Sequence, residues 1–487
     1  MSPSVIDRLA GLANLARADI AALGYPNTPW HVPKLGAEEA DVEDVVIVGG
    51  GQSGLMAAAA LKWDGLRRVA VLDAAARGAE GPWTTFGRMA ELRTPKTSSG
   101  IDFNVPNLTV RRWFETRYGE GAWDALTRVP RADWKDYLDW YAGVFDIAIE
   151  NDSRVVDVAP DGAALAVVVQ KGGRIVTRRA RTVVLATGYA GAGSWRAPAF
   201  VRDHLPARRY NHTNGPIDVD ALKGKRVGVL GHGASAFDNA IFALENGAKS
   251  VELCFRRARL PRVNPHRALE NAGLLGNYPD LADLTRWRIA RHFRDNDQPP
   301  AVRSFQTALG MAGFRLRPGT PWHSVRDTAS GVRVLTDGGE LEYDHLLLAT
   351  GMIVDLGART ELTSLGDLVA LWSDRFNPPK GEDDARLGQL PYLDAHYAFE
   401  PLQPKDAWVR RVFAFNICAA VSHGPHSTSI SGHRHCLPRL VRGIERRMLL
   451  DREGEIVSAL KAYRSEDLPT PDDFEDDFAR SPQAAAE

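Results

Sequence analysis

The chain has 487 residues, of which 44% are hydrophobic and 25% are charged, and its formal net charge at pH 7 is −1. This length exceeds one ordinary domain, and the charge balance excludes recruitment of nucleic acid or an anionic membrane by a global field. No apolar run approaches the roughly 20 residues of a membrane helix. Three distant cysteines (Cys254, Cys418 and Cys436) form no C-x-x-C pair, so we expect a cytoplasmic protein without a disulfide framework.

The first part of the chain predicts an amphipathic helix over 4–23 and then a βαβ opening, with strands over 44–48 and 68–72 and a helix over 53–64. The turn after the first strand reads G-x-G-x-x-G from Gly49 to Gly54. In such a turn the first glycine allows the tight bend, and the second lets the backbone approach a pyrophosphate. The third glycine lets the helix pack closely, and the helix N-terminus supplies N–H groups to the phosphates.

Asp73 ends the second strand, where an acid accepts hydrogen bonds from ribose hydroxyls. A solvated aspartate at a strand end is the alternative. We therefore predict that this unit binds a dinucleotide. The residues expected to contact it are Gly49, Gly51, Gln52, Ser53, Gly54 and Asp73.

The stretch 81–146 is rich in Trp, Tyr and Arg, and the spacing of its apolar residues predicts a helix over 131–145. Alternating strands follow over 153–187 and end in Ala186-Thr187-Gly188.

A second G-x-G-x-x-A turn runs from Gly231 to Ala236, and its second strand is predicted over 250–255. That strand ends in Arg256 and Arg257 instead of an acid. Arginine suits the 2′-phosphate of NADP and disfavours the free ribose diol of NAD, although a basic surface turn is the alternative. The residues expected to contact this second dinucleotide are Gly231, Gly233, Ala234, Ser235, Arg256 and Arg257.

Residues 264–320 are predicted to form a helical insertion, in which Trp287 and Arg291 share one face. That face is either a cap over the substrate or a solvated basic surface. Strands are expected again over 332–336 and 345–349, and the second of them ends in another A-T-G. We then expect a loop over 422–432, a helix over 437–449 and an acidic, mobile tail from Pro469.

This order of motifs resembles the class B flavoprotein monooxygenases, which include flavin-containing monooxygenases, amine N-hydroxylases and Baeyer–Villiger monooxygenases. The resemblance is strongest at 49–54, 92–96, 231–236 and 349–356. The family's identifying F-x-G-x-x-x-H stretch is present only in degenerate form, with His212 as the counterpart of its histidine.

The resemblance implies an α/β fold of two interleaved Rossmann-like dinucleotide-binding domains with a helical insertion, FAD on the first loop and NADPH on the second. The expected division is an N-terminal helix and lead-in (1–40), a first FAD-binding part (41–215), an NADPH-binding domain (216–345) with the insertion 264–320, a second FAD-binding part (346–450), and a C-terminal helix with the acidic tail (451–487).

The resemblance also implies a single-component monooxygenase. NADPH reduces the flavin, and a C4a-(hydro)peroxyflavin formed with O2 inserts one oxygen atom into a small molecule. N-hydroxylation of a small amine or amino acid is favoured slightly. Baeyer–Villiger or S-oxygenation of a small ketone or sulfide, and an NAD(P)H-dependent flavin reductase, stay open. The expected partners are a small substrate and O2, with no nucleic acid and no membrane, and a homo-oligomer is left open.

By the same resemblance, segment 81–89 runs along the flavin. Trp83 and Met89 would pack against the ring, unless they are ordinary core residues. The residues expected to act in catalysis are Arg88, Lys96 near flavin N5, and His212. Those expected to complete the cofactor sites are Trp83, Met89, Thr187, Thr350, Gly351, His423, His426 and Ser427.

Four histidines and a cysteine between 423 and 436 have the spacing of zinc ligands. They lie in a glycine- and hydroxyl-rich loop that enters a helix, which suits binding of the polar edge of a flavin. We therefore expect no metal site there.

Overall fold

We describe the protein from a computed structural model, which covers residues 3–29, 41–98 and 100–464. By its internal contacts the chain divides into a large unit, Met1–Ile444, and a small one, Glu445–Glu487. No helix among the described residues is long and apolar enough to span a membrane. The acidic tail expected from Pro469 and residues 30–40 of the lead-in lie outside the described residues.

A seven-stranded sheet follows the order β3-β2-β1-β6-β5-β4, and β17 also pairs with β6. Strands β1, β2, β3, β6 and β17 are parallel, whereas β4 and β5 form an antiparallel extension. Val45, Val46 and Ile47 of β1 are fully buried, as is typical of a central strand with both faces covered. The strands are β1 (Val42–Val48), β2 (Val69–Leu72), β3 (Ile149–Glu150), β4 (Ser153–Asp161), β5 (Ala164–Lys171), β6 (Arg174–Leu185) and β17 (Val412–Ala414).

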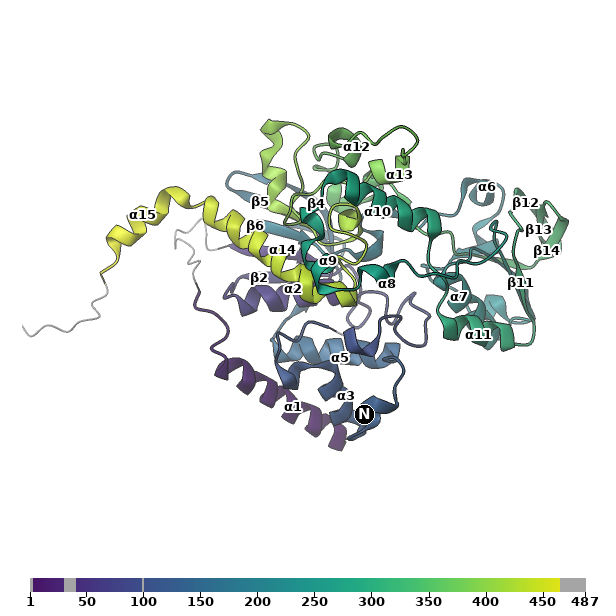
Figure 1. Ribbon diagram of the computed structural model, residues 1–487, viewed down its shortest axis with the longest axis horizontal. Helices are drawn as coiled ribbons and strands as arrows, with labels where there is room; N and C mark the ends of the chain where they lie inside the picture. Colours follow the sequence, from purple (N-terminus) through teal and green to yellow (C-terminus); the bar gives the residue numbers. More distant parts are fainter. Residues whose placement is uncertain (1–2, 30–40, 99, 465–487) are drawn as a thin grey trace, which may run out of the picture. The chain divides into compact units, whose positions relative to one another are not determined.

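A second sheet is entirely parallel, in the order β11-β10-β9-β15-β8. Its core includes Val227, Phe237 and Leu253, all fully buried. These elements lie together with the antiparallel sheet β12-β13-β14 (Figure 1). The strands are β8 (Tyr210–His212), β9 (Arg226–Leu230), β10 (Ser250–Cys254), β11 (Phe314–Arg317), β12 (Ser324–Thr328), β13 (Gly331–Thr336), β14 (Gly339–Tyr343) and β15 (His345–Leu348).

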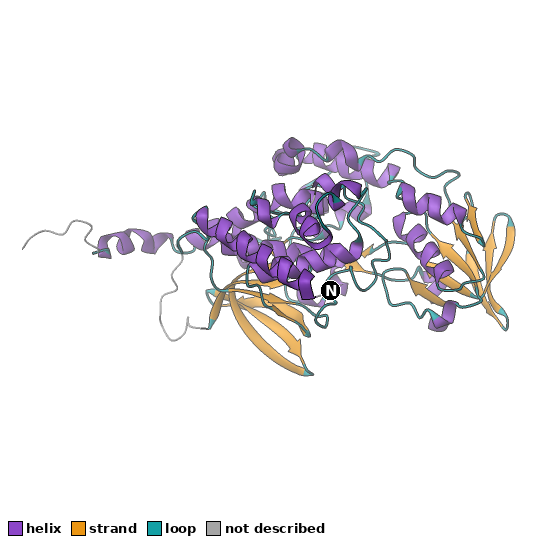
Figure 2. Ribbon diagram, turned by 90° about the horizontal axis from the view of Figure 1, so that it is seen from below, coloured by secondary structure: helices purple, strands orange, loops and turns teal. Residues whose placement is uncertain are grey.

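The strands of the large unit form two separate groups (Figure 2). The helices are α1 (Pro3–Ala22), α2 (Gln52–Trp63), α3 (Val110–Tyr118), α4 (Ala122–Ala125), α5 (Arg131–Val144), α6 (Ala199–Arg202), α7 (Ala234–Glu245), α8 (His266–Leu269), α9 (Ala272–Asn277), α10 (Asp283–Asn296), α11 (Val302–Gly310), α12 (Trp372–Arg375), α13 (Ala385–Gly388), α14 (Ile430–Leu450) and α15 (Glu453–Ala462).

The α/β fold class with two dinucleotide-type units is confirmed, and two boundaries are corrected. The insertion is not helical throughout 264–320, because β11 extends the second sheet and α11 packs on α7. Helix α14 begins at Ile430 and so includes residues predicted as loop. Burial of Ile430, His433 and Leu437 outweighs the low helix propensity of this Ser- and Gly-rich stretch.

Candidate functional site

Each glycine loop lies against the end of a neighbouring strand that carries an A-T-G sequence. Gly49 has φ +109°, and a Cβ there would lie 2.5 Å from the Ala186 carbonyl oxygen. Gly231 has φ +134°, and a Cβ there would lie 2.5 Å from the Ala349 carbonyl oxygen. Both positions therefore require glycine, for conformation and for space.

We call the first glycine loop, with the N-terminus of α2 that follows it, the first cradle; Gly51 caps that N-terminus. The nearest atom to a Cβ on Gly51 is the Cα of Gly81, at 3.5 Å. A Cβ on Gly81 would in turn lie 3.7 Å from the indole nitrogen of Trp83. That indole N–H is buried without a hydrogen-bond partner, which is unusual for a native structure. A helix N-terminus, a close backbone approach and an orphaned donor together fit a pyrophosphate.

Around this cradle the polar side chains are held in place. Asp73 accepts hydrogen bonds from the N–H groups of Gly50 and Ala75, both at 2.7 Å. Burial raises the pKa of Asp73, and these two bonds offset part of the rise. Ser53, in the first turn of α2, lies 3.0 Å from Nε2 of His433. Burial lowers the pKa of His433 to about 3, so this imidazole is neutral.

The second glycine loop, which joins β9 to α7, forms a second cradle of the same kind. Gly233 caps the N-terminus of α7, and a Cβ on it would meet no atom within 4 Å. Arg256 is exposed just beyond β10, and Arg257 donates from Nη2 to the Asp295 carbonyl at 2.9 Å. The space at Gly233 and the two guanidinium groups fit a dinucleotide with a 2′-phosphate.

Between the cradles the chain crosses over twice, and the two crossings pair as strands β7 (Gly193–Ser194) and β16 (Ile353–Val354). The exposed ring of Tyr189 stacks on Trp195, with centroids 5.7 Å apart and planes at 7°. Trp195 contacts His212, whose Nε2 lies 3.2 Å from the Gly351 carbonyl oxygen. Arg386 donates to the next carbonyl along, that of Met352, at 2.8 Å. We call Tyr189, Trp195, His212 and Arg386 the crossover cluster.

The chain is 42% identical over 458 residues to the FAD-dependent urate hydroxylase of Xanthomonas campestris pv. campestris, a match that covers 93% of this chain and 96% of that protein. The chain belongs to the class B flavoprotein monooxygenases. A family model described as pyridine nucleotide-disulphide oxidoreductase matches residues 46–270 of this monooxygenase. The three buried, free cysteines form no redox pair, so the dithiol chemistry in that description has no counterpart here.

Solved structures share the fold of this flavoprotein monooxygenase. An ornithine hydroxylase from Pseudomonas aeruginosa matches with a TM-score of 0.65 at 18% identity, over 84% of this chain and 100% of that chain. The L-lysine 6-monooxygenase from Pseudomonas syringae matches with a TM-score of 0.63 at 19% identity, over 83% and 99% of the two chains. The expected cofactor pair, FAD with NADPH, is that of the family.

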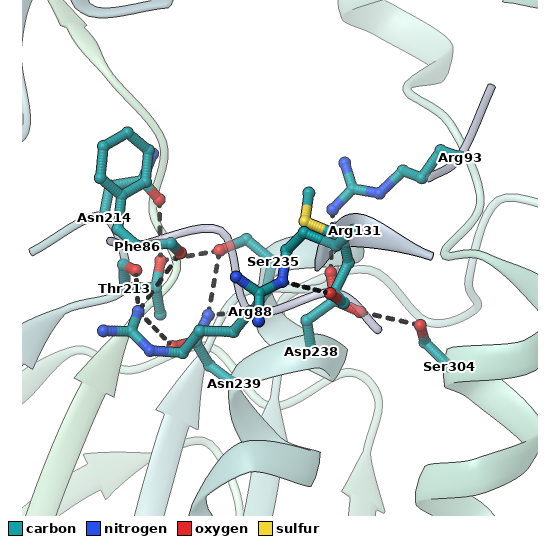
Figure 3. Close-up of polar contacts among 11 residues, drawn as sticks. Phe86, Arg88, Arg93, Arg131, Thr213, Asn214, Ser235, Asp238, Asn239 and Ser304 are labelled. Carbon is teal, nitrogen blue, oxygen red and sulfur yellow. Dashed lines mark hydrogen bonds and ion pairs between the residues drawn. The ribbon is translucent and has the colours of Figure 1, made fainter. Parts of the chain in front are cut away.

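Arg88 joins segment 81–89 to the second dinucleotide-type unit of this monooxygenase (Figure 3). Its Nη1 donates to the Thr213 carbonyl at 2.6 Å and to Oδ1 of Asn239 at 3.0 Å, and its Nη2 donates to the Gly215 carbonyl at 2.9 Å. Burial, and then the charge of Arg131, lower the pKa of Arg88. These hydrogen bonds make Arg88 a structural bridge between the two segments, and the predicted catalytic role of Arg88 stays a prediction.

The other predicted catalytic side chains are also engaged by the protein. The Lys96 ammonium donates to the Trp123 carbonyl at 2.7 Å and lies over the Trp123 ring, so action at a flavin would require it to leave these partners. Burial lowers the pKa of His212, and its Nδ1 accepts from the Asn214 N–H at 3.2 Å. Nε2 of this neutral imidazole therefore carries the proton and donates to Gly351. Met89 is half-buried.

The histidine-rich loop before α14 packs inward. His423 stacks on Tyr397 with centroids 3.6 Å apart, and its Nδ1 is buried without a partner. Nε2 of His426 lies 3.3 Å from Nδ1 of His266, which belongs to α8 of the insertion. Ser427 is buried. The described residues contain no group of three or more side chains placed to hold a metal ion, and the predicted flavin contacts of this loop stay predictions.

Sequence reasoning missed several side chains at these sites. Tyr189 directly follows the first A-T-G, so its position was a usable signal. His433 stood out only as part of the histidine-rich stretch, with nothing to indicate Ser53 as its partner. Trp195 and Asp297 carried no local signal, because they reach the crossover and the second cradle only through tertiary packing.

Proposed function

We propose that this flavin-dependent monooxygenase hydroxylates urate or a closely related planar, anionic heterocycle, with NADPH as the reductant. One atom of O2 enters the product and the other leaves as water, while NADPH supplies two electrons. The observation that carries the proposal is the crossover cluster, in a chain 42% identical to a urate hydroxylase along nearly its whole length.

The crossover cluster offers the two features that such a substrate needs. Tyr189 is 65% exposed while its ring stacks on Trp195, so this two-ring aromatic stack is accessible to a planar ligand. Arg386 is exposed, and among the described residues no carboxylate lies within ion-pair distance of it. The nearby Asp384 carboxylate, which acts on Arg386 through its charge, is already paired with Arg294 at 2.6 Å. A guanidinium without an ion-pair partner of its own suits an anion with adjacent oxygen and nitrogen acceptors.

The two cradles would hold the cofactors on either side of this cluster. FAD would lie on Gly51 and α2, with the Trp83 N–H directed at its pyrophosphate, and NADPH would lie on Gly233 and α7. When bound, FAD accepts a hydride and activates O2, which no amino-acid side chain does. The chain's own part is to bind, orient and exclude water. Parallel sheets bind ligands beyond the carboxyl ends of their strands. In both sheets of this protein the carboxyl end of a central strand, β6 or β15, leads directly into a crossover.

N-hydroxylation of a small amine or amino acid is the second candidate. The solved structures of an ornithine hydroxylase and a lysine monooxygenase favour it through the shared fold. A cationic amine calls for a carboxylate partner, whereas the crossover cluster supplies Arg386. The cluster therefore favours the anionic substrate.

The test is to mix the FAD-loaded enzyme with NADPH and air, then add urate, L-ornithine or L-lysine while following NADPH, O2, substrate and H2O2. We expect urate to accelerate NADPH oxidation, with NADPH, O2 and urate consumed in equal amounts and little H2O2 formed. Arg386→Gln should raise the KM for urate about tenfold or more, the cost of a charge-assisted hydrogen bond.

Arg196→Gln is the matched control. It also removes a positive charge from the crossover, but Asp355 already pairs with the Arg196 guanidinium at 3.4 Å. It should leave the KM for urate within about twofold. Stimulation by the amines and not by urate would replace the proposal with N-hydroxylation. Recovery of all the O2 as H2O2 with every substrate would indicate a flavin reductase.

A further inference from the structure

The second glycine loop has an acidic neighbour that comes from the insertion. Helix α10 ends at Asn296, and Asp297 follows with φ +60°, a left-handed conformation that few residues other than glycine adopt. Its Oδ2 lies 3.1 Å from Nε2 of His232, the residue between Gly231 and Gly233. The Gln298 N–H donates to its other oxygen at 2.8 Å.

The same turn also contacts one of the arginines beyond β10, since Arg257 donates to the Asp295 carbonyl. Burial raises the pKa of Asp297, but the His232 imidazole, the Gln298 N–H and the charge of Arg257 outweigh it and hold the pKa below its ordinary value. The carboxyl group is therefore ionised at neutral pH. Its side chain is 41% exposed, so a ligand can reach it.

The position of Asp297 matters because no acid follows β10. In units that bind NAD, an acid at the end of the second strand accepts a hydrogen bond from the ribose 2′-hydroxyl. Here that position is basic, with Arg256 and Arg257. Asp297 brings a carboxylate to the same neighbourhood from another part of the chain. A carboxylate attracts a ribose diol and repels a 2′-phosphate of two negative charges.

We propose that Asp297 sets the preference of this enzyme between NADPH and NADH. It accepts a hydrogen bond from the ribose of NADH and opposes the 2′-phosphate of NADPH, which Arg256 and Arg257 bind. The enzyme consequently uses both reductants. This inference rests on the proposed placement of the nicotinamide dinucleotide on the second glycine loop.

The experiment measures the Kd of NADP+ and of NAD+ for the FAD-loaded enzyme by calorimetry. In Asp297→Asn we expect NADP+ to bind about fivefold more tightly or better, the factor for removing a nearby like charge, and NAD+ to bind more weakly. Asp295→Asn is the matched control. It makes the same change two residues away and keeps the backbone carbonyl that Arg257 contacts, so both Kd values should stay unchanged. Arg257→Gln should act oppositely and weaken NADP+ alone.

Asp297→Gly provides a second variant, because glycine adopts the left-handed conformation readily; it should shift both Kd values in the same directions as Asp297→Asn. Unchanged Kd values in both Asp297 variants, with NADP+ weakened by Arg257→Gln, would overturn the role of Asp297 and leave the placement intact. If Gly233→Ala and Arg257→Gln both leave the two Kd values unchanged, the placement on the second loop is itself wrong.

Discussion

At the scale of single residues, the glycines of the first loop have two different roles. A Cβ on Gly54 would lie 1.8 Å from the Gly49 carbonyl oxygen, so this glycine is required by the protein's own packing. A Cβ on Gly51 meets nothing closer than 3.5 Å, and its φ of −69° suits any residue. The protein's own packing therefore does not require glycine at position 51, which leaves the close approach of a pyrophosphate as the reason for it.

Gly51→Ala separates cofactor binding from folding. We expect the purified variant to retain little FAD, because the new methyl group fills the phosphate space. The free energy of unfolding of its FAD-free form should stay equal or rise by about 0.4–1 kcal/mol, as for glycine replacements at compatible sites. The measurements are the FAD-to-protein ratio and urea unfolding. Gly54→Ala, the control, should lower both. A fully loaded Gly51→Ala protein would show that the first loop does not hold FAD.

At the scale of elements, α10 connects the segment 372–384 to the second glycine loop. Trp287 is buried against Trp372 and Phe376, and its Nε1 donates to the Glu382 carbonyl at 2.8 Å. This face of the helix is therefore neither a cap over the substrate nor a solvated basic surface, the two alternatives that the sequence left open. Because α10 is anchored at Trp287 and ends beside His232, its seating decides where Asp297 lies.

Trp287→Phe should loosen this helix without unfolding the protein. The smaller ring and the lost hydrogen bond should cost about 1–3 kcal/mol of unfolding free energy. The ratio of the NADP+ and NAD+ dissociation constants should move in the same direction as in Asp297→Asn, since the carboxylate would be less well positioned. His292→Gln, at an exposed position of the same helix, should change neither the free energy of unfolding nor the ratio of the dissociation constants. A loss of stability with an unchanged ratio would separate the seating of α10 from nucleotide preference.

The elements that could be predicted are those with local signals. Both glycine loops, the strands leading into them and the two A-T-G ends follow from short-range pattern, and the described structure has them in place. The extent of the insertion could not be predicted, because only pairing with β10 marks 314–317 as a strand of the second sheet. The unpartnered N–H of Trp83 could not be predicted either, because a tryptophan in a core and a tryptophan beside a phosphate look the same in the sequence.

At the scale of the whole molecule, several histidines are buried as neutral groups. Burial lowers the pKa of His423 and of His433 to about 3. Burial also lowers the pKa of His266 and of His345 to about 4. The charge of His426 adds to the shift of His266, and the charge of Arg209 adds to that of His345. In the unfolded chain each would have a pKa near 6.5. Below that pH the unfolded state takes up protons that the native state does not, so stability falls as pH falls.

The loss should begin near pH 6.5 and continue down to about pH 3–4, where the native imidazoles also become protonated. Each histidine should remove about 1–2 kcal/mol of unfolding free energy at pH 5 relative to pH 7.5. The check is urea unfolding of the FAD-loaded enzyme at pH 7.5, 6 and 5, followed by tryptophan fluorescence. His433→Gln should lessen the pH dependence by one histidine's share, because glutamine gains no proton, while His204→Gln, at an exposed site, should not. An undiminished pH dependence in His433→Gln would mean that the imidazole beside Ser53 has a pKa near 6.5 in the native protein too, and is therefore charged there at pH 5. Ser53 would then accept a hydrogen bond from a cation at the N-terminus of α2, and the electrostatics of the first cradle would be more positive than the neutral pair provides.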